Sequence, residues 1–232
     1  MSQDGANRVP EEPSRTPDPG NPRVRFLYAK RGPACFLSHA DLPVLFGRAA
    51  RRGGLTVSLT QGFSPHPKVS LGPPLPVGVV GLEEPLEVWF EDWDPCGFRR
   101  FADALPPGFS LVGAQEVRGP SLASRCRAGS YDLFLREGAD PEAALEGLRG
   151  WEEGAPALRE LRLQEDRISL VLLEPDRYGP SHLVRALVAA GVLGSWGDLL
   201  VVRRRIGDWE EGTGRVLPLM EPGPQAPEEV SS

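Results

Sequence analysis

The sequence predicts a mixed α+β protein made of two tandem ferredoxin-like modules packed together. Three observations favour this class. Short strand-like segments alternate with amphipathic helical segments, their order is strand–helix–strand–strand–helix–strand, and this order occurs twice on either side of a Pro/Ser/Gly/Arg-rich stretch. Nothing repeats at a shorter fixed period, so we expect a duplicated architecture and not a solenoid.

The first module is predicted over residues 23–118. Its first strand alternates polar and apolar side chains, as a half-buried strand does. Its first helix begins at Ser38, with Asp41 three residues later forming a capping box, and it ends at a pair of glycines. The elements are a strand over 23–29, this helix, a strand over 55–60, a loop whose end at 69–72 can pair as a strand edge, a strand over 86–91, a helix up to 105 and a strand over 109–117.

The second module is predicted over residues 131–216, after a linker at 119–130. Asp140 followed by Pro141 is typical of a helix start, because proline suits the first helical position. The elements are strands over 131–137, 158–164, 167–173 and 199–206 and helices over 141–148 and 181–190. The segments 1–22 and 217–232 are rich in Pro and acidic residues, so we expect two disordered tails.

Composition favours a cytoplasmic protein without a cofactor. None of the 232 residues belongs to an apolar run long enough for a membrane span, and the first residues lack a signal core. The three cysteines are widely spaced, which fits reduced thiols better than disulfides. No CxxC pattern is present, so we expect no bound metal and no iron–sulfur cluster.

The charge distribution points to an anionic partner. The chain carries a net charge of −6, but residues 23–82 carry eight basic residues against one acid, a net of +7. Both lysines of the chain, Lys30 and Lys68, fall in this block. A basic block inside an acidic chain indicates a polyanionic or phosphate-bearing partner such as RNA.

The stretch 61–78, QGFSPHPKVSLGPPLPVG, is the predicted functional loop. The prolines on both sides of His66 stiffen the backbone and fix the direction of the imidazole. Lys68 supplies a compact charge suited to phosphate. We expect this loop and the preceding helix to form one basic site, with the substrate-binding residues Gln61, Ser64, His66, Lys68, Arg48, Arg51 and Arg52.

His39 lies at the first turn of the predicted helix. An imidazole there can exchange a proton near neutral pH, and a helix N-terminus disfavours its charged form. His39 is therefore either a surface or capping histidine or a catalytic group paired with His66. Two histidines and Asp41 match no metal-ligand spacing, so no metal is predicted.

The segments RGPACFLSHADL and QGFSPHPKVSLGPPLPVG resemble the uncharacterised radical-SAM-associated domain family. The likeness extends in layout over about residues 23–215, and its specific part is residues 31–78. Ser64 stands where the family commonly has asparagine, and Cys35 stands where it commonly has arginine. The resemblance implies a radical SAM enzyme as a partner, acting in trans because this chain lacks the cysteine triad.

Three functions remain open at this point. The first is a binding module that holds RNA or another phosphate-bearing substrate for a radical SAM partner. The second is a metal-independent ribonuclease-like enzyme that uses His39 and His66 as general base and acid. The third is an adaptor whose loop docks the partner protein.

Overall fold

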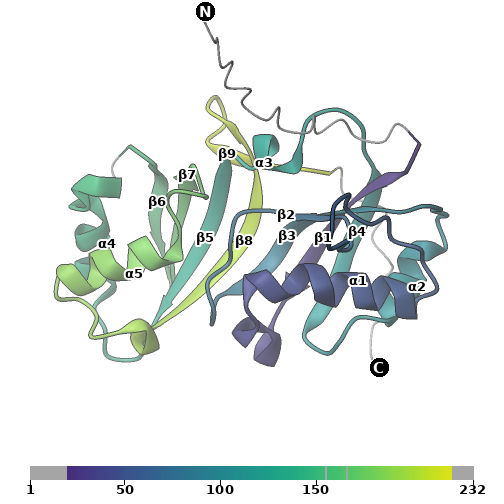
Figure 1. Cartoon of the computed structure of the whole chain (residues 1–232). Coiled ribbons are helices and arrows are strands. Elements are labelled where there is room, and N and C mark those ends of the chain that lie inside the picture. Colours follow the sequence, from purple (N-terminus) through teal and green to yellow (C-terminus); the bar gives the residue numbers. More distant parts are fainter. Residues whose placement is uncertain (1–19, 155, 166, 221–232) are drawn as a thin grey trace, which may run out of the picture.

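In the computed structural model, which describes residues 20–154, 156–165 and 167–220, a single sheet carries a few helices on its faces (Figure 1). The predicted mixed α+β class is confirmed. The strands are β1 (Arg23–Lys30), β2 (Val69–Leu71), β3 (Val80–Trp89), β4 (Phe109–Glu116), β5 (Ala128–Leu135), β6 (Leu158–Gln164), β7 (Arg167–Leu173), β8 (Leu199–Glu210) and β9 (Arg215–Pro218). The α-helices are α1 (Leu42–Arg52), α2 (Gly97–Asp103), α3 (Leu122–Arg125), α4 (Pro141–Arg149) and α5 (Pro180–Ala189).

Within the described residues the sheet has nine strands in the order β4-β1-β3-β8-β5-β7-β6, with β2 paired to β3 and β9 paired to β8. Its strand pairs are antiparallel except for the join between β3 and β8. The two halves of the chain therefore meet edge to edge inside one continuous sheet.

The second strand of the first half is not where the sequence placed it. Residues 55–60 make only isolated bridges, Val57 with Phe90 and Leu59 with Pro67. The strand that pairs regularly with β3 is β2, where Val69 lies opposite Val88. Both segments alternate polar and apolar side chains, so the choice between them depends on long-range pairing with β3 and not on local pattern.

The predicted tails fall mainly on residues 1–19 and 221–232, which lie outside the described residues. The C-terminal tail was predicted to begin at residue 217. The strand β9 instead continues to Pro218, and Leu219 and Met220 are buried.

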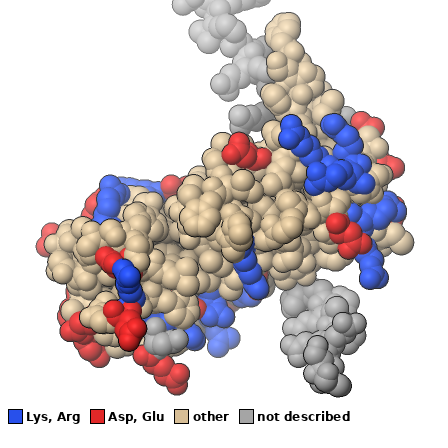
Figure 2. All heavy atoms as spheres, turned by 90° about the horizontal axis from the view of Figure 1, so that it is seen from below, with Lys and Arg blue, Asp and Glu red and all other residues tan. Residues whose placement is uncertain are grey.

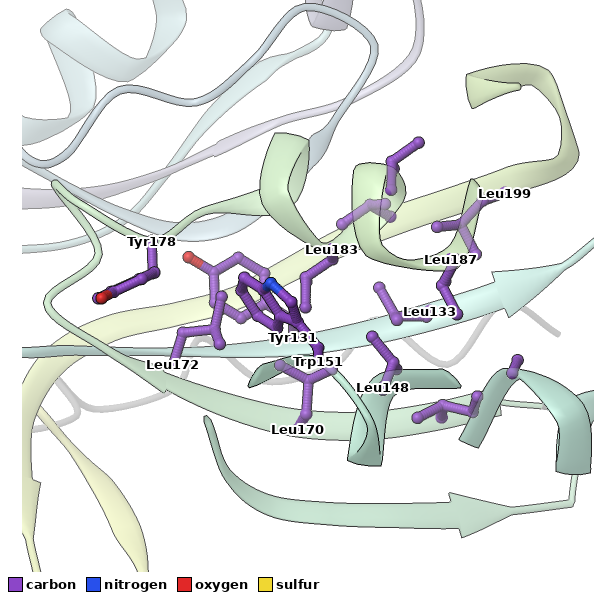
Figure 3. Packing of buried hydrophobic residues seen from close by; sticks show 14 of the residues in the cluster. Tyr131, Leu133, Leu148, Trp151, Leu170, Leu172, Tyr178, Leu183, Leu187 and Leu199 are labelled. Carbon is purple, nitrogen blue, oxygen red and sulfur yellow. The ribbon is translucent and has the colours of Figure 1, made fainter. Parts of the chain in front are cut away.

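Two hydrophobic cores lie between the sheet and its four longer helices, which share one side of the sheet (Figure 1). In the first half, Phe46 of α1 and Phe101 of α2 pack against Phe26 of β1. In the second half, leucines of α4 and α5 point towards Tyr131 and Trp151 (Figure 3). The short α3 packs on the opposite face, where Leu122 contacts Ile206 and Leu219.

A buried ion pair joins the two halves. The strands β3 and β8 pair over only two positions, Val80 with Val202 and Gly81 with Arg203. The Arg203 guanidinium donates from Nε to Glu84 Oε1 at 2.8 Å and from Nη2 to Glu84 Oε2 at 2.5 Å. It also donates to the carbonyl oxygens of Pro73 and Pro74. Both charged side chains are almost completely buried. The short strand contact is therefore supported by a bidentate ion pair and by two further hydrogen bonds from Arg203 to backbone carbonyls.

We expect Glu84→Gln to lower the free energy of unfolding by about 3–5 kcal/mol, because it leaves the Arg203 charge buried without a counter-ion. The matched control is Glu83→Gln, since Glu83 pairs with the partly exposed Arg205. That control should cost about 1 kcal/mol or less. Urea unfolding measures both, and equal losses in the two variants would contradict the central role of Arg203–Glu84.

Candidate functional site

The predicted loop projects from the molecule and is closed at its base. Leu59 and Pro67 form a β-bridge, the Thr60 amide donates to the His66 carbonyl at 2.8 Å, and the His66 amide donates to Thr60 Oγ1 at 3.0 Å. Residues 61–66 are all exposed, and Phe63 near the middle of the loop is fully exposed. The Leu59–Pro67 bridge and the hydrogen bond to the Thr60 hydroxyl close the base of the loop, and the Phe63 ring extends from it into solvent.

The base of this loop packs on α1. A Cβ added to Gly47 would come within 2.5 Å of Cγ of Pro67, so only glycine allows this close approach. Glycine inside a helix normally costs about 1 kcal/mol relative to alanine, and here the docking of Pro67 gives a reason for it. The sequence prediction that the loop and the preceding helix come together is therefore met at Gly47 and Pro67.

Lys68 turns to the face of the sheet opposite α1. Its Nζ lies 5.1 Å from the centre of the Trp89 ring, and the Arg23 guanidinium carbon lies 5.9 Å from the same ring. Val88 and Phe90 on either side of Trp89 belong to the core beneath α1. Because successive side chains of a strand point to opposite faces, Trp89 with Lys68 and Arg23 lies on the face away from α1.

The arginines of α1 lie on the helix side of the sheet. Arg48, Arg51 and Arg52 are exposed, and their spacing of three and four residues places them on one side of the helix. Arg52 Nη2 donates to the Ala104 carbonyl at 2.7 Å, and Arg100 Nε donates to the Gly53 carbonyl at 3.2 Å. Figure 2 shows Lys and Arg side chains gathered on the underside of the molecule, at the end where α1 and α2 lie.

The predicted single basic pocket is thus replaced by two groups of cations on opposite sides of the loop. The α1 arginines lie on the helix side, and Lys68 lies on the other side, over Trp89. The loop residues Gln61, Ser64 and His66 are exposed. The reason is that Pro67 contacts α1 while the next residue enters the pairing with β3 and alternates to the far face.

His39 belongs to a different environment from the loop. It opens a 3₁₀ turn, His39–Asp41, where the Ser38 hydroxyl accepts from the Ala40 amide. Desolvation lowers the pKa of His39 below its ordinary 6.5, the Arg203 charge lowers it further, and Glu84 acts in the opposite direction. Its Nδ1 is buried and has no hydrogen-bond partner among the described residues. The charges that act on it come from the junction of the two halves and not from the residues around His66.

This placement bears on the catalytic hypothesis. A general acid–base pair must reach one substrate atom together. His66 is exposed on the loop and makes its backbone contacts with Thr60, whereas the electrostatic neighbours of His39 are Arg203, Glu84 and Lys30. The described geometry gives no support to a His39–His66 pair, and no group of three or more possible metal ligands converges within the described part of the chain.

Sequence reasoning missed the junction residues. Lys30 is fully buried and donates from Nζ to the Leu37 carbonyl at 2.7 Å, and Glu84 is 2% exposed. Desolvation lowers the pKa of Lys30, with the nearby charge of Arg203 adding to the effect. One signal was available: the three consecutive arginines 203–205 lie in the strand predicted over 199–206, where a buried charge needs a partner. Glu83 and Glu84 gave no such signal, because the neighbouring strand was predicted to begin only at residue 86, whereas β3 begins at Val80.

Family comparison places the chain in a bacterial family. Residues 23–164, more than half of the chain, match the family described as "Uncharacterized protein conserved in bacteria (DUF2344)". The chain belongs to this family. No protein with a curated description matches it. The family description names no radical SAM protein, so that association remains a prediction from the sequence resemblance.

The solved structures that match this chain have low sequence identity and low TM-scores. The regulatory subunit of aspartate kinase from Thermus thermophilus is 12% identical, with a TM-score of 0.25, over 74% of this chain and 92% of that one. A putative glycine cleavage system transcriptional repressor is 9% identical, with a TM-score of 0.24, over 81% and 98%. The first two RRM domains of yeast poly(U) binding protein are 9% identical, with a TM-score of 0.20, over 78% and 98%. Similarities at this level carry no argument about function.

In the described residues no helix is both long enough and apolar enough to cross a membrane. The cysteines Cys35, Cys96 and Cys126 are unpaired.

We expect Gly47→Ala to destabilise the protein, although alanine alone favours a helix by about 1 kcal/mol. The added methyl group overlaps the Pro67 ring and forces the loop base away from α1. The double variant Gly47→Ala with Pro67→Gly should recover part of that stability, because glycine removes both Pro67 atoms, Cγ at 2.5 Å and Cβ at 2.8 Å, that the new methyl group overlaps. Thermal unfolding of the two variants tests the contact, and a single variant as stable as the parent would contradict it.

We also expect a pH dependence from His39. Its folded-state pKa is lowered, so below about pH 6.5 the unfolded chain binds a proton that the folded chain resists. The stability that neutral His39 provides is therefore present above that pH and is lost as the pH falls towards the lowered pKa. Unfolding of the parent and of His39→Gln at about pH 7.5 and about pH 5.5 should show the parent losing more stability on acidification. An equal or smaller loss in the parent would contradict the assignment.

Proposed function

We propose that this protein is a binding module for single-stranded RNA, held by the projecting loop and by the cations on its two sides. The observation that carries the proposal is the placement of Phe63. Its ring is fully exposed on a loop with a closed base, and that base lies between the α1 arginines and the Lys68–Trp89 pair. An exposed aromatic ring on a loop whose base has cations on both sides suits an unpaired base with phosphates nearby.

The polar side chains of the loop support the same ligand. Gln61, Ser64 and His66 are exposed beside Phe63 and offer hydrogen bonds to base edges or to ribose hydroxyls. Proteins that recognise RNA by its bases take single strands, because unpaired bases are free to stack on aromatic rings. The basic segment 23–82 contains Phe63, these three polar residues, Lys68 and the α1 arginines.

We further propose that the chain is two ferredoxin-like modules sharing one sheet. The strand order β4-β1-β3 with β2 on β3 in the first half matches β8-β5-β7-β6 in the second, element by element. The boundaries 23–118 and 131–216 stay predictions from the sequence; β5 already begins at Ala128, inside the predicted linker. On this view the RNA-binding loop is an elaboration of the connection between the first helix and second strand of one module.

The partner proposed from the sequence resemblance is a radical SAM enzyme acting in trans. In that role the module would hold the RNA while the partner carries out the chemistry. Co-purification of the chain with a radical SAM enzyme encoded beside it tests this part separately. Failure to associate, with or without RNA, would remove the partner but not the RNA ligand.

The RNA proposal is tested by anisotropy of a labelled single-stranded RNA of about twelve nucleotides. The affinity should fall with salt, because phosphate contacts release counterions, with a slope of about 0.7 for each contact. Phe63→Ala should weaken binding by about five- to a hundredfold, the range for loss of one stacked base. Arg51→Gln should lower the salt slope.

The matched controls are Phe36→Ala and Arg136→Gln. Phe36 is another strongly exposed phenylalanine, and Arg136 is an exposed arginine of the second half. Both should bind like the parent. Binding that ignores salt, or equal loss in Phe63→Ala and Phe36→Ala, would contradict the proposal. Shortening of the RNA during the titration would instead favour the ribonuclease-like alternative.

A further inference from the structure

A polar pocket lies on the face of the second half that no long helix covers. Its volume is about 420 Å³, and its lining includes Asp132 of β5, Ser169 of β7, Arg204 of β8 and Arg162 of β6. Tyr131 and Leu133 belong to the core beneath α4 and α5, so Asp132 between them faces the opposite side. The pocket is therefore separated from the RNA-binding loop, which belongs to the first half.

The pocket is lined by more positive than negative charge. Four arginines, Arg162, Arg167, Arg204 and Arg215, contribute to its walls against two acids, Asp132 and Glu160, a balance of 4 − 2 = +2. The guanidiniums come from four different strands and line one hollow, where Arg162 also pairs with Glu160 through Nη2. Converging arginines with excess positive charge are the usual means by which proteins hold phosphate groups.

The buried carboxylate of Asp132 pairs with two of these arginines, Arg204 and Arg167, and the Arg167 Nε lies 3.6 Å from Asp132 Oδ2. The side chain of Asp132 is 4% exposed, and its Oδ1 accepts from the Ser169 hydroxyl at 2.7 Å. Its Oδ2 accepts from Arg204 through a single nitrogen, Nη1, at 2.5 Å. The Arg204 side chain is 53% exposed, so the rest of its planar fork faces the pocket and solvent. Asp132 thus holds a guanidinium in a fixed direction, ready for a bidentate anion.

The rim of the pocket carries backbone strain. The pairing of β6 with β7 shifts register between Arg159 and Arg162, and Glu160 in that bulge has a φ of +50°. A non-glycine residue in this region costs free energy and persists where the surrounding structure imposes it. The bulge brings Glu160 against Gly214 in the β8–β9 turn, where an added Cβ would lie 2.6 Å from Glu160 Oε1. Bulges of this kind redirect side chains beside binding sites.

We propose that this pocket binds the phosphate group of a small phosphorylated molecule of mononucleotide size. The pocket volume lies in the lower part of the range for small-molecule sites, which suits a phosphate with one sugar or base. Arg204 and Arg162 bind the phosphate, and Gln164 and Thr213, which also line the pocket, hydrogen-bond the rest of the ligand. Asp132 acts as a positioning residue that orients Arg204.

Isothermal titration calorimetry with adenosine 5′-monophosphate, inorganic phosphate and adenosine tests this site. The monophosphate should bind, inorganic phosphate should compete with it, and adenosine should bind at least about tenfold more weakly, since it offers no charged acceptor. Arg204→Gln and Arg162→Gln should each weaken monophosphate binding by about tenfold or more. Arg162 is 67% exposed, so its replacement leaves the fold intact.

Arg136→Gln is the matched control, an exposed arginine of the same half outside this pocket, and it should bind like the parent. The proposal is overturned if the monophosphate does not bind, if adenosine binds equally well, or if both pocket variants bind unchanged. Phe63→Ala should keep monophosphate binding, and Arg204→Gln should keep RNA binding. If the pocket does not bind the monophosphate, this result is therefore distinguishable from a loss of RNA binding by the loop. Loss of RNA affinity in Arg204→Gln would overturn the proposal of a mononucleotide site and show that the pocket holds an RNA phosphate.

Discussion

The buried pair between Arg203 and Glu84 is the interaction on which the arrangement of the two halves depends. The parallel contact of β3 and β8 covers two residue pairs, too few to fix the angle between the halves by backbone hydrogen bonds alone. The guanidinium also reaches the carbonyls of Pro73 and Pro74, so it ties the segment after β2 to the same point. A buried ion pair adds little net stability compared with an apolar pair, because desolvation offsets its attraction. Its contribution here is to select one register and one orientation of the second half.

The same arginine also holds the chain segment that follows the projecting loop. Besides the pairing of β2 with β3, the contacts that hold the connection from α1 to β3 include Pro67 against Gly47, the carbonyls of Pro73 and Pro74 on Arg203, and the Gly78 amide on the Cys35 carbonyl at 2.9 Å. Between α1 and the first of these contacts the chain leaves the body of the protein and exposes Phe63. A long connection anchored in this way combines a rigid base with an accessible tip, which is how binding loops are positioned on folded scaffolds.

Local features of the sequence predicted only part of the local structure. The capping box predicted for Ser38 and Asp41 is not formed, because the Ser38 hydroxyl accepts from the Ala40 amide in a 3₁₀ turn and α1 begins at Leu42. Asp140 was predicted to cap a helix, and its Oδ1 accepts from the amides of Glu142 and Ala143. The other positions that escaped prediction are those decided by contacts between distant residues. Residues 55–60 and Val69–Leu71 have equally strand-like patterns, and only the regular pairing of Val69–Leu71 with β3 distinguishes them. The pairing of β2 with β3 decides on which face of the sheet Lys68 lies. The sequence indicated that the loop and α1 come together, but it could not show that Lys68 lies on the face away from the α1 arginines.

Net charge describes this molecule poorly because many of its acids are internal counter-ions. Glu84 and Asp132 are buried and each holds an arginine, and Glu87, also buried, accepts from Arg25 at 2.6 Å. Acids used in this way fix the direction of guanidiniums while contributing little negative potential outside the protein, since each is neutralised at contact distance. Charges further apart than about 8–10 Å are screened at physiological salt, so an anionic ligand responds to the local groups and not to the sum of −6. An acidic protein can therefore present two cationic surfaces, the one beside Phe63 and the one above Asp132, each built by arginines that carboxylates or carbonyls hold in place.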